Sequence, residues 1–124
     1  MGTTQRVAQF ITNVRYGDIP GPAIDMAKLC LLDVIGCALY GSTRPLGRIM
    51  IDTVEELGGK PVAHVLGTGI MTNAVNAALA NGTLAHSEDF DNMGNGHQAS
   101  LLMPVTLARS EEHTSELQSQ STIS

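Results

Sequence analysis

The residues most able to do chemistry gather in one short stretch near the centre of the sequence. Residues 81–92 read NGTLAHSEDFDN in a chain of which only 15% is charged. The titratable residues of this stretch are His86, Glu88, Asp89 and Asp91, with His97 following after a glycine-rich gap. Apolar runs that can form a core flank the stretch on both sides. Titratable groups concentrated between two core-forming segments indicate a candidate functional site.

Two kinds of chemistry suit these residues. An aspartate beside a histidine can hold the imidazole in one tautomer and act with it as an acid/base pair. His86 and Asp89 share a face wherever the helix persists, whereas Asp89 and Asp91 point to different sides. A metal site is the second possibility, but the absence of cysteine and of a His-x-x-x-His pair makes zinc improbable. A structural alternative stays open, in which His86 is a core histidine and Glu88 and Asp91 are polar residues of a helix end.

Composition excludes several classes of protein. The chain has 124 residues, 43% of them hydrophobic, and a net charge of -5, which fits one globular domain or a piece of one. An acidic chain has no basic surface for a phosphate backbone, so we expect no nucleic-acid partner. No apolar run approaches the roughly 20 residues of a membrane span, so we expect no membrane partner. Cys30 and Cys37 are about 10 Å apart along one predicted helix, too far for a disulfide, and reduced thiols favour a cytoplasmic location.

The hydrophobic pattern predicts the elements that position this stretch. Apolar residues recur at helical spacing, with capping or stop signals at the ends. The predicted helices span residues 3–15, 22–40, 44–57, 72–86 and 98–108. The second is apolar over most of its circumference, which predicts a central helix. We therefore predict an all-α fold, a helical bundle of about five helices, with one candidate short strand near residues 62–66.

A glycine-containing turn follows the candidate strand. Gly67-Thr68-Gly69 stands between a possible strand and a helix, as a dinucleotide-binding loop does. The third glycine of that loop is missing, and no second strand with a terminal acidic residue follows. We therefore predict a plain turn and no bound cofactor.

The composition changes sharply at Arg109. Residues 109–124 read RSEEHTSELQSQSTIS, with two apolar residues and no periodicity, which predicts a disordered polar tail. Residues 109–119 also look like the in-frame translation of a common short-read sequencing adapter, with 120–122 as a sample index. We therefore predict a truncated helical domain over residues 1–108 and a non-native tail over residues 109–124.

Several motifs resemble those of the MmgE/PrpD family, the group that contains 2-methylcitrate dehydratase, cis-aconitate decarboxylase and iminodisuccinate epimerase. The resemblance covers nearly all of residues 4–108. Its motifs are LLDVIGCALYGS at residues 31–42, AALANGTLAH at 77–86 and DFD at 89–91, followed by His97 and Pro104. The Asn-Gly-Thr, His and Asp-Phe-Asp run is a specific signature of the family.

The resemblance implies a helical N-terminal domain that joins a smaller α+β domain in a homodimer. It implies proton abstraction next to a carboxylate of a small di- or tricarboxylate, without metal or cofactor. Asp89 and His97 match the active-site aspartate and histidine of the family, and we expect His86 and Asp91 to support them. Met93 stands where the family often has threonine, so a hydroxyl contact with the substrate is absent. Proline is also usual where this chain has Gln98.

The resemblance leads to a functional prediction. We expect a fragment of a cofactor-independent lyase, most like 2-methylcitrate dehydratase, which acts by proton abstraction and loss of water. No basic residue lies near the cluster in the sequence, and the family takes a lysine and another histidine from later in the chain. The 124-residue chain should therefore be inactive. The alternatives are an activity like that of cis-aconitate decarboxylase or iminodisuccinate epimerase, or a non-catalytic helical interaction module.

Overall fold

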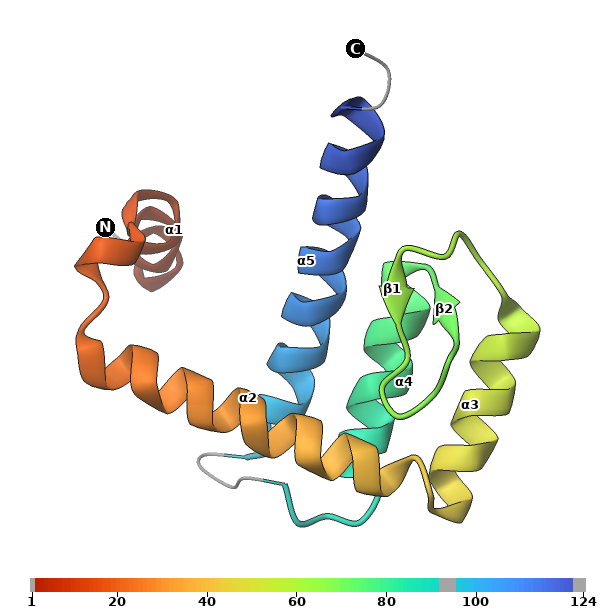
Figure 1. Cartoon of the computed structure of the whole chain (residues 1–124). Coiled ribbons are helices and arrows are strands. Elements are labelled where there is room, and N and C mark those ends of the chain that lie inside the picture. Colours follow the sequence, from red (N-terminus) through yellow and green to blue (C-terminus); the bar gives the residue numbers. More distant parts are fainter. Residues whose placement is uncertain (1, 92–95, 122–124) are drawn as a thin grey trace.

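The computed structural model describes residues 2–91 and 96–121, without the side chains of residues 119–121 (Figure 1). Its helices are α1 (Thr3–Asn13), α2 (Gly21–Gly41), α3 (Pro45–Leu57), α4 (Ala74–His86) and α5 (Gln98–Ser121). A 3-10 turn, η1 (Tyr16–Asp18), and two short strands, β1 (Ala63–His64) and β2 (Met71–Thr72), complete the described elements. The prediction of a helical fold with about five helices is confirmed.

Helix α4 lies at the centre of the bundle. It packs against α2, α3 and α5. Helix α2 crosses the C-terminal end of α4 and the N-terminal end of α5, and α1 lies apart at the N-terminal end of α2 (Figure 1). The main core is aliphatic: Val34, Cys37, Ala38, Ile51, Val54, Val65, Ala80, Leu84, Ala85 and Ala99. The prediction that the second helix is the central one is wrong, because α2 buries only residues of its C-terminal half.

Two glycines let α2, α3 and α4 approach one another closely. A Cβ at Gly41 would meet the backbone carbonyl of Leu84, and a Cβ at Gly47 would meet the carbonyl of Gly41. Neither neighbour is a flexible side chain, so larger residues would force the helices apart. This contact holds the C-terminal end of α4, where His86 lies, against the end of α2.

The candidate strand near residues 62–66 is present in a shorter form. β1 pairs antiparallel with β2, with Ala63 opposite Thr72. The turn between them contains Gly67, whose φ is +75°, and the hydroxyl of Thr68 accepts a hydrogen bond from the Ile70 amide at 3.0 Å. The Gly67-Thr68-Gly69 segment therefore forms a turn, as predicted, but this turn joins two strands and does not lead directly into a helix. β2 is an addition that the sequence pattern did not indicate.

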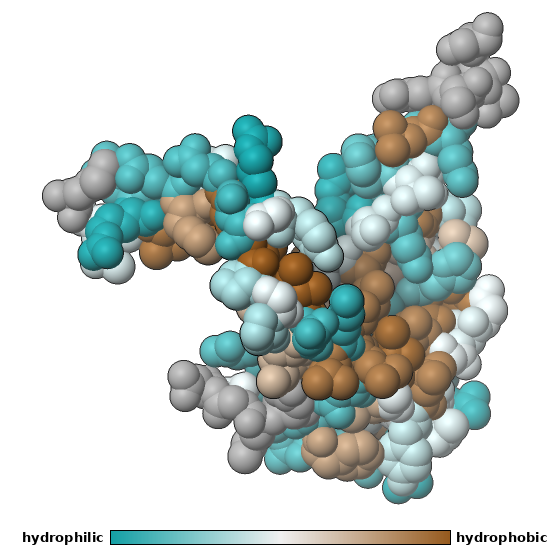
Figure 2. Space-filling model, turned by 60° about the vertical axis from the view of Figure 1, so that its left-hand side comes forward, coloured by the Kyte–Doolittle hydropathy of each residue, from teal (hydrophilic) through white to brown (hydrophobic). Residues whose placement is uncertain are grey.

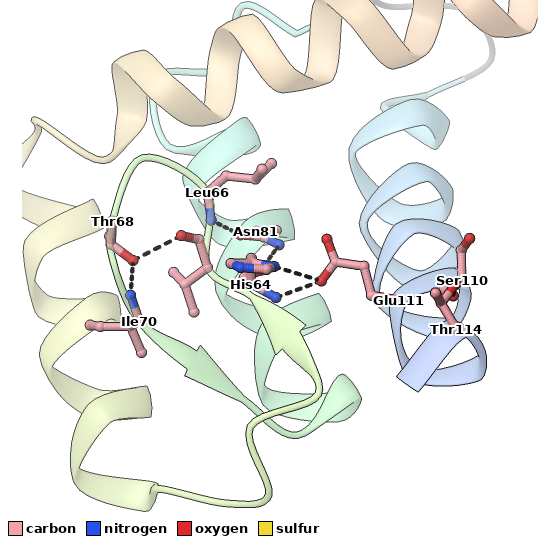
Figure 3. A network of polar contacts seen from close by, with 9 residues as sticks. His64, Leu66, Thr68, Ile70, Asn81, Ser110, Glu111 and Thr114 are labelled. Carbon is pink, nitrogen blue, oxygen red and sulfur yellow. Dashed lines mark hydrogen bonds and ion pairs between the residues drawn. The ribbon is translucent and has the colours of Figure 1, made fainter. Parts of the chain in front are cut away.

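Asn81 joins this hairpin to α4. Its side-chain oxygen accepts a hydrogen bond from the Leu66 amide at 2.8 Å, and its amide group donates to the His64 carbonyl at 2.9 Å (Figure 3). The residue is only 2% exposed, and both polar atoms of its side chain are satisfied. The asparagine of the Asn-Gly-Thr motif thus has a structural role in this fold.

Helix α5 is longer than the sequence predicted. It continues through Ala108 to Ser121, so the prediction of a disordered tail is wrong for residues 109–121. Extending a formed helix adds one hydrogen bond for each residue fixed, and the pair of Arg109 and Glu112, 2.8 Å apart, supports the added turns. Pro104 lies inside the helix and is fully buried. The adapter interpretation concerns the origin of these residues and stays a prediction.

Large apolar side chains remain exposed on several helices. No residue of α1 is buried. Figure 2 shows apolar surface gathered where α1 and the first part of α2 meet the rest of the bundle. The exposed residues include Phe10 and Ile11 on α1, Met26, Leu29 and Leu32 on α2, Val75 and Leu79 on α4, and Leu101, Leu102 and Val105 on α5. In the described ranges no helix combines the length and apolar character that a membrane crossing requires.

Replacing Asn81 with alanine should destabilise the fold strongly. The change leaves the Leu66 amide and the His64 carbonyl without their partner, at a cost of about 2 kcal/mol or more. Urea unfolding followed by circular dichroism measures the loss. Asn13→Ala removes the same amide from an exposed position and should change stability by no more than about 0.5 kcal/mol. Equal effects of the two substitutions would contradict this role of Asn81.

The exposed apolar faces should make the isolated chain associate with itself. Contiguous apolar surface of this kind binds partners or hydrophobic dyes. We expect oligomers in light scattering coupled to size exclusion, and strong enhancement of the fluorescence of a naphthalene-sulfonate dye. Replacing both Leu29 and Leu32 with lysine should reduce both signals, since these side chains are exposed on α2. A monomeric chain that does not enhance the fluorescence of the dye would contradict the prediction.

Candidate active site

The structure brings four of the predicted site residues together at the connection between α4 and α5. They are His86, Asp89, Asp91 and His97, and one nitrogen or oxygen atom from each lies within 4.8 Å of those from the others. His86 is the last residue of α4, and His97 directly precedes α5. Met93, the remaining predicted site residue, lies outside the described residues.

Asp91 is the buried anchor of this cluster. Its side chain is 0% exposed, and its Oδ1 accepts a hydrogen bond from His86 Nδ1 at 2.8 Å. Nδ1 of His97 lies 3.1 Å from the same oxygen, but not in hydrogen-bonding geometry. The ring centres of the two histidines are 4.5 Å apart. One buried carboxylate therefore contacts both imidazoles and fixes their relative position.

Asp89 is the exposed partner of the same histidines. Its side chain is 78% exposed, and its Oδ1 lies 3.3 Å from His97 Nε2 and 3.9 Å from His86 Nε2. Asp89 and Asp91 do face different nitrogens of the same histidines, although α4 ends at His86 and neither aspartate lies on the helix. Asp89 lies in the turn that follows α4 with a φ of +57°, a left-handed conformation that few residues other than glycine adopt.

Electrostatics distinguishes the buried groups around the cluster. Burial alone would raise the pKa of Asp91, but the interactions with His86 and Ser100, together with the charges of the two histidines, lower it below its usual value. Burial raises the pKa of the Cys37 thiol, and the nearby carboxylates of Asp33 and Asp91 raise it further. Asp91 is thus held as an anion, while Cys37 is held as a neutral thiol.

The arrangement of His97 suits proton transfer. Its side chain is 23% exposed, with one ring nitrogen facing the buried Asp91 and the other facing the exposed Asp89. With Nδ1 3.1 Å from the buried Asp91 carboxylate, the other ring nitrogen, Nε2, is the one that can exchange a proton with a ligand. A ligand at the surface can contact both His97 Nε2 and the Asp89 carboxylate.

The same four side chains offer donor atoms that a divalent transition metal accepts. Two imidazoles and two carboxylates are ligands typical of zinc and of iron. The spacing argument against zinc considered one helix only, and the structure adds His97 from the start of the next helix. The prediction that the site uses no metal stays a prediction.

Sequence reasoning missed other residues around the site. Ser100 contributes to the low pKa of Asp91, and its place three residues after His97 on a predicted helix could have indicated this. Arg44 binds Glu88 with Nε and Oε1 3.2 Å apart, although 44 residues separate them in sequence. The basic side chain of Arg44 therefore lies beside the cluster. The sequence around residues 81–92 gives no indication of this contact.

An apolar groove leads away from the histidines. It has a volume of about 790 Å³ and lies between α4 and α5, with His86 and His97 among its lining residues. Val75, Leu79 and Leu101 form much of its wall. The groove joins the polar cluster to the exposed apolar faces of the bundle.

Comparison with known proteins identifies the family. The family model of the MmgE/PrpD N-terminal domain matches residues 5–121. The chain belongs to the MmgE/PrpD family. This family is enzymatic, and the resemblance stated from the motifs is confirmed.

Two curated relatives of this MmgE/PrpD chain come from Aspergillus species. Cis-aconitate decarboxylase of Aspergillus terreus is 26% identical over 113 residues, which is 89% of this chain and 23% of that protein. The cis-aconitate decarboxylase-like protein oryM of Aspergillus oryzae is 27% identical over 111 residues, 87% of this chain and 23% of that protein. The chain spans about a quarter of the length of these relatives.

The buried anion at Asp91 should make stability depend on acidity. Because the pKa of Asp91 is lower in the folded state than in the unfolded chain, its contribution to stability is complete above the unfolded value of about 3.9. That contribution is lost as the pH falls through the lower folded value. Asp91→Asn should therefore destabilise the chain at pH 7 and differ less from the parent near pH 3. Urea midpoints measured across this range test the prediction.

Asp52→Asn is the matched control for this titration, since Asp52 is exposed on α3. Its difference from the parent should remain small at every pH. If Asp91→Asn behaved in the same way, the carboxylate would not be the stabilising anion that the structure indicates.

Proposed function

We propose that this chain supplies the acid/base half of the active site of a cofactor-independent lyase that acts on a small di- or tricarboxylate. The observation that carries the proposal is the position of His97 between the buried Asp91 and the exposed Asp89. The names of the curated relatives favour decarboxylation, of the kind performed on cis-aconitate, over the dehydration that the motifs had led us to place first.

The geometry suits the proton movements of a decarboxylation. When the bond to a carboxylate breaks and carbon dioxide leaves, its electron pair remains on the substrate and must be protonated at carbon. A protonated His97 can deliver that proton from Nε2, while Asp91 stabilises the charged imidazolium from the other side. Asp89, 3.3 Å from the same nitrogen, can then pass a proton from water to His97.

Dehydration and epimerisation need the same pair in other roles. In dehydration, a base removes a proton next to a carboxylate and an acid protonates the departing hydroxyl group. In epimerisation, a proton is removed and returned on the opposite face. These activities remain second candidates, because Asp89 and His97 provide two groups that exchange protons at one place. Met93, at a position where the family often has threonine, is proposed as a residue that distinguishes among them.

Substrate binding requires positive charge that this cluster does not provide by itself. A carboxylate ligand is bound most strongly by arginine or lysine, and Arg44 is already paired with Glu88. We propose that further cationic side chains come from the remainder of a longer enzyme, four times as long in the relatives. We also propose that this longer enzyme is a homodimer and that the 124-residue chain alone is inactive.

A helical interaction module is the candidate from another class. The exposed apolar residues on α1, α2 and α5 favour it, since such surfaces bind protein partners. A module would melt cooperatively by itself and would not need Asp89 or His97. The catalytic proposal requires both residues.

Substitutions in the longer enzyme test the catalytic proposal. The coding DNA is first amplified and reread across the junction of Ala108 and Arg109, and the extended protein is assayed with cis-aconitate and with 2-methylcitrate. Asp89→Asn and His97→Gln should each lower kcat by about 10²-fold or more, the range expected for loss of an acid or base. Asp52→Asn and His64→Gln change exposed residues outside the cluster and should retain full activity.

Two results would contradict the proposal. The first is unchanged turnover in both Asp89→Asn and His97→Gln. The second is DNA that encodes Arg109 to Ser124 and then stops, with a purified chain that folds cooperatively and shows no turnover. That outcome favours the interaction module.

A further inference from the structure

We propose that Arg44 and Tyr40 are positioning residues that hold the Asp89 carboxylate against His97. The inference rests on the proposed function and deepens it, since it concerns the carboxylate that exchanges protons with His97 there. Asp89 is highly exposed and has a positive φ, and its described contacts are with the two histidines and the turn that follows α4. Burial of the side chain therefore does not fix its orientation. The backbone on either side of it must do so.

The residue before Asp89 is held by an ion pair. Arg44 Nε donates a hydrogen bond to Glu88 Oε1 at 3.2 Å, and both side chains are partly shielded from solvent. Arg44 lies at the start of α3, where the close approach of Gly47 to Gly41 fixes the backbone. The anchor for Glu88 thus lies beside the close helix contact at Gly41 and Gly47.

The residue after Asp89 is held by an aromatic contact. The rings of Phe90 and Tyr40 have centres 5.6 Å apart and are tilted by 50°. The guanidinium carbon of Arg44 lies 5.5 Å from the centre of the same Tyr40 ring. Tyr40 is in the last turn of α2, next to Gly41. Both neighbours of Asp89 are therefore attached to one cluster, formed by Tyr40 and Arg44.

These attachments explain the conformation of Asp89. A chain fixed at Glu88 and again at Phe90 has one residue in which to reverse direction, and a left-handed residue makes a tight reversal. Aspartate tolerates this region better than most side chains. With φ at +57°, its Oδ1 reaches to within 3.3 Å of His97 Nε2. The Asp89 amide also donates a hydrogen bond to the His86 carbonyl at 3.2 Å, so the two attachments add to a turn that the end of α4 already begins.

The test measures the conformation of Asp89 directly, by nuclear magnetic resonance of the 124-residue chain with Leu29 and Leu32 replaced by lysine, the pair of changes expected to reduce its self-association. The readouts are the coupling between the amide and α protons of Asp89, which reports φ, and the nuclear Overhauser effect between Asp89 and the His97 ring. Arg44→Gln and Tyr40→Leu should each weaken the Overhauser effect by about threefold. A loss of this size is expected when a half-exposed ion pair or an aromatic contact is removed. The coupling should shift toward the value of an extended residue.

Matched variants separate positioning from general damage to the fold. Arg48→Gln removes another arginine of α3, an exposed one, and should leave both readouts unchanged. The double exchange Arg44→Glu with Glu88→Arg restores the ion pair in reverse and should recover much of the signal. Urea midpoints for all variants show whether the bundle remains folded. In the extended enzyme, Arg44→Gln should lower kcat more than it changes KM.

The outcomes are distinct for the two proposals. If Arg44→Gln and Tyr40→Leu matched Arg48→Gln in both resonance readouts, the positioning role would be overturned while the acid/base proposal stood. If the double exchange failed to recover signal in a chain that remained folded, the ion pair would not be the cause. If positioning behaved as expected but Asp89→Asn kept full turnover, the catalytic assignment would fail instead.

Discussion

Where α2, α3 and α4 meet, there is no room for a side chain at Gly41 or Gly47. Their Cα atoms lie so close to the carbonyls of Leu84 and Gly41 that even one added carbon would collide with backbone. This contact sets the end of α4 against the end of α2 and the start of α3. His86, the last residue of α4, and the turn that follows it are therefore placed by backbone packing. The cluster of His86, Asp89, Asp91 and His97 depends on this placement, because its residues lie in or beside that turn.

The two aspartates of the cluster have the same chemistry and opposite surroundings. Asp91 is buried, ionised and in contact with both imidazoles, so its position is tightly determined. Asp89 is exposed and depends on its backbone for orientation. A buried anion orients the histidines, and an exposed one can meet a ligand. This division of roles is typical of sites in which paired carboxylates serve different functions.

The surfaces of this fold differ in how well their polar and apolar groups are covered. Around the hairpin, Asn81 satisfies backbone groups that would otherwise be buried without partners. On α1, α2 and α5, by contrast, large apolar side chains face solvent. The curated relatives are about four times as long. The exposed apolar faces agree with the proposal that other parts of a longer enzyme pack against this domain. The cluster also has too few arginine or lysine side chains to bind a carboxylate ligand by itself, which agrees with the same proposal.

The sequence by itself determined the family, the helices and most of the site. Periodicity and capping are local properties, so the second, third and fourth helices were placed to within two residues, and the motif of residues 81–91 marked the site. Tertiary structure alone decided the rest. A strand as short as β2 has no sequence signal apart from its partner, and the turns of α5 beyond Ala108 form on a helix that is already established. The approach of Asp89 to His97 and the pairing of Arg44 with Glu88 join residues whose distance in space is fixed only when α2, α3 and α4 pack at Gly41 and Gly47.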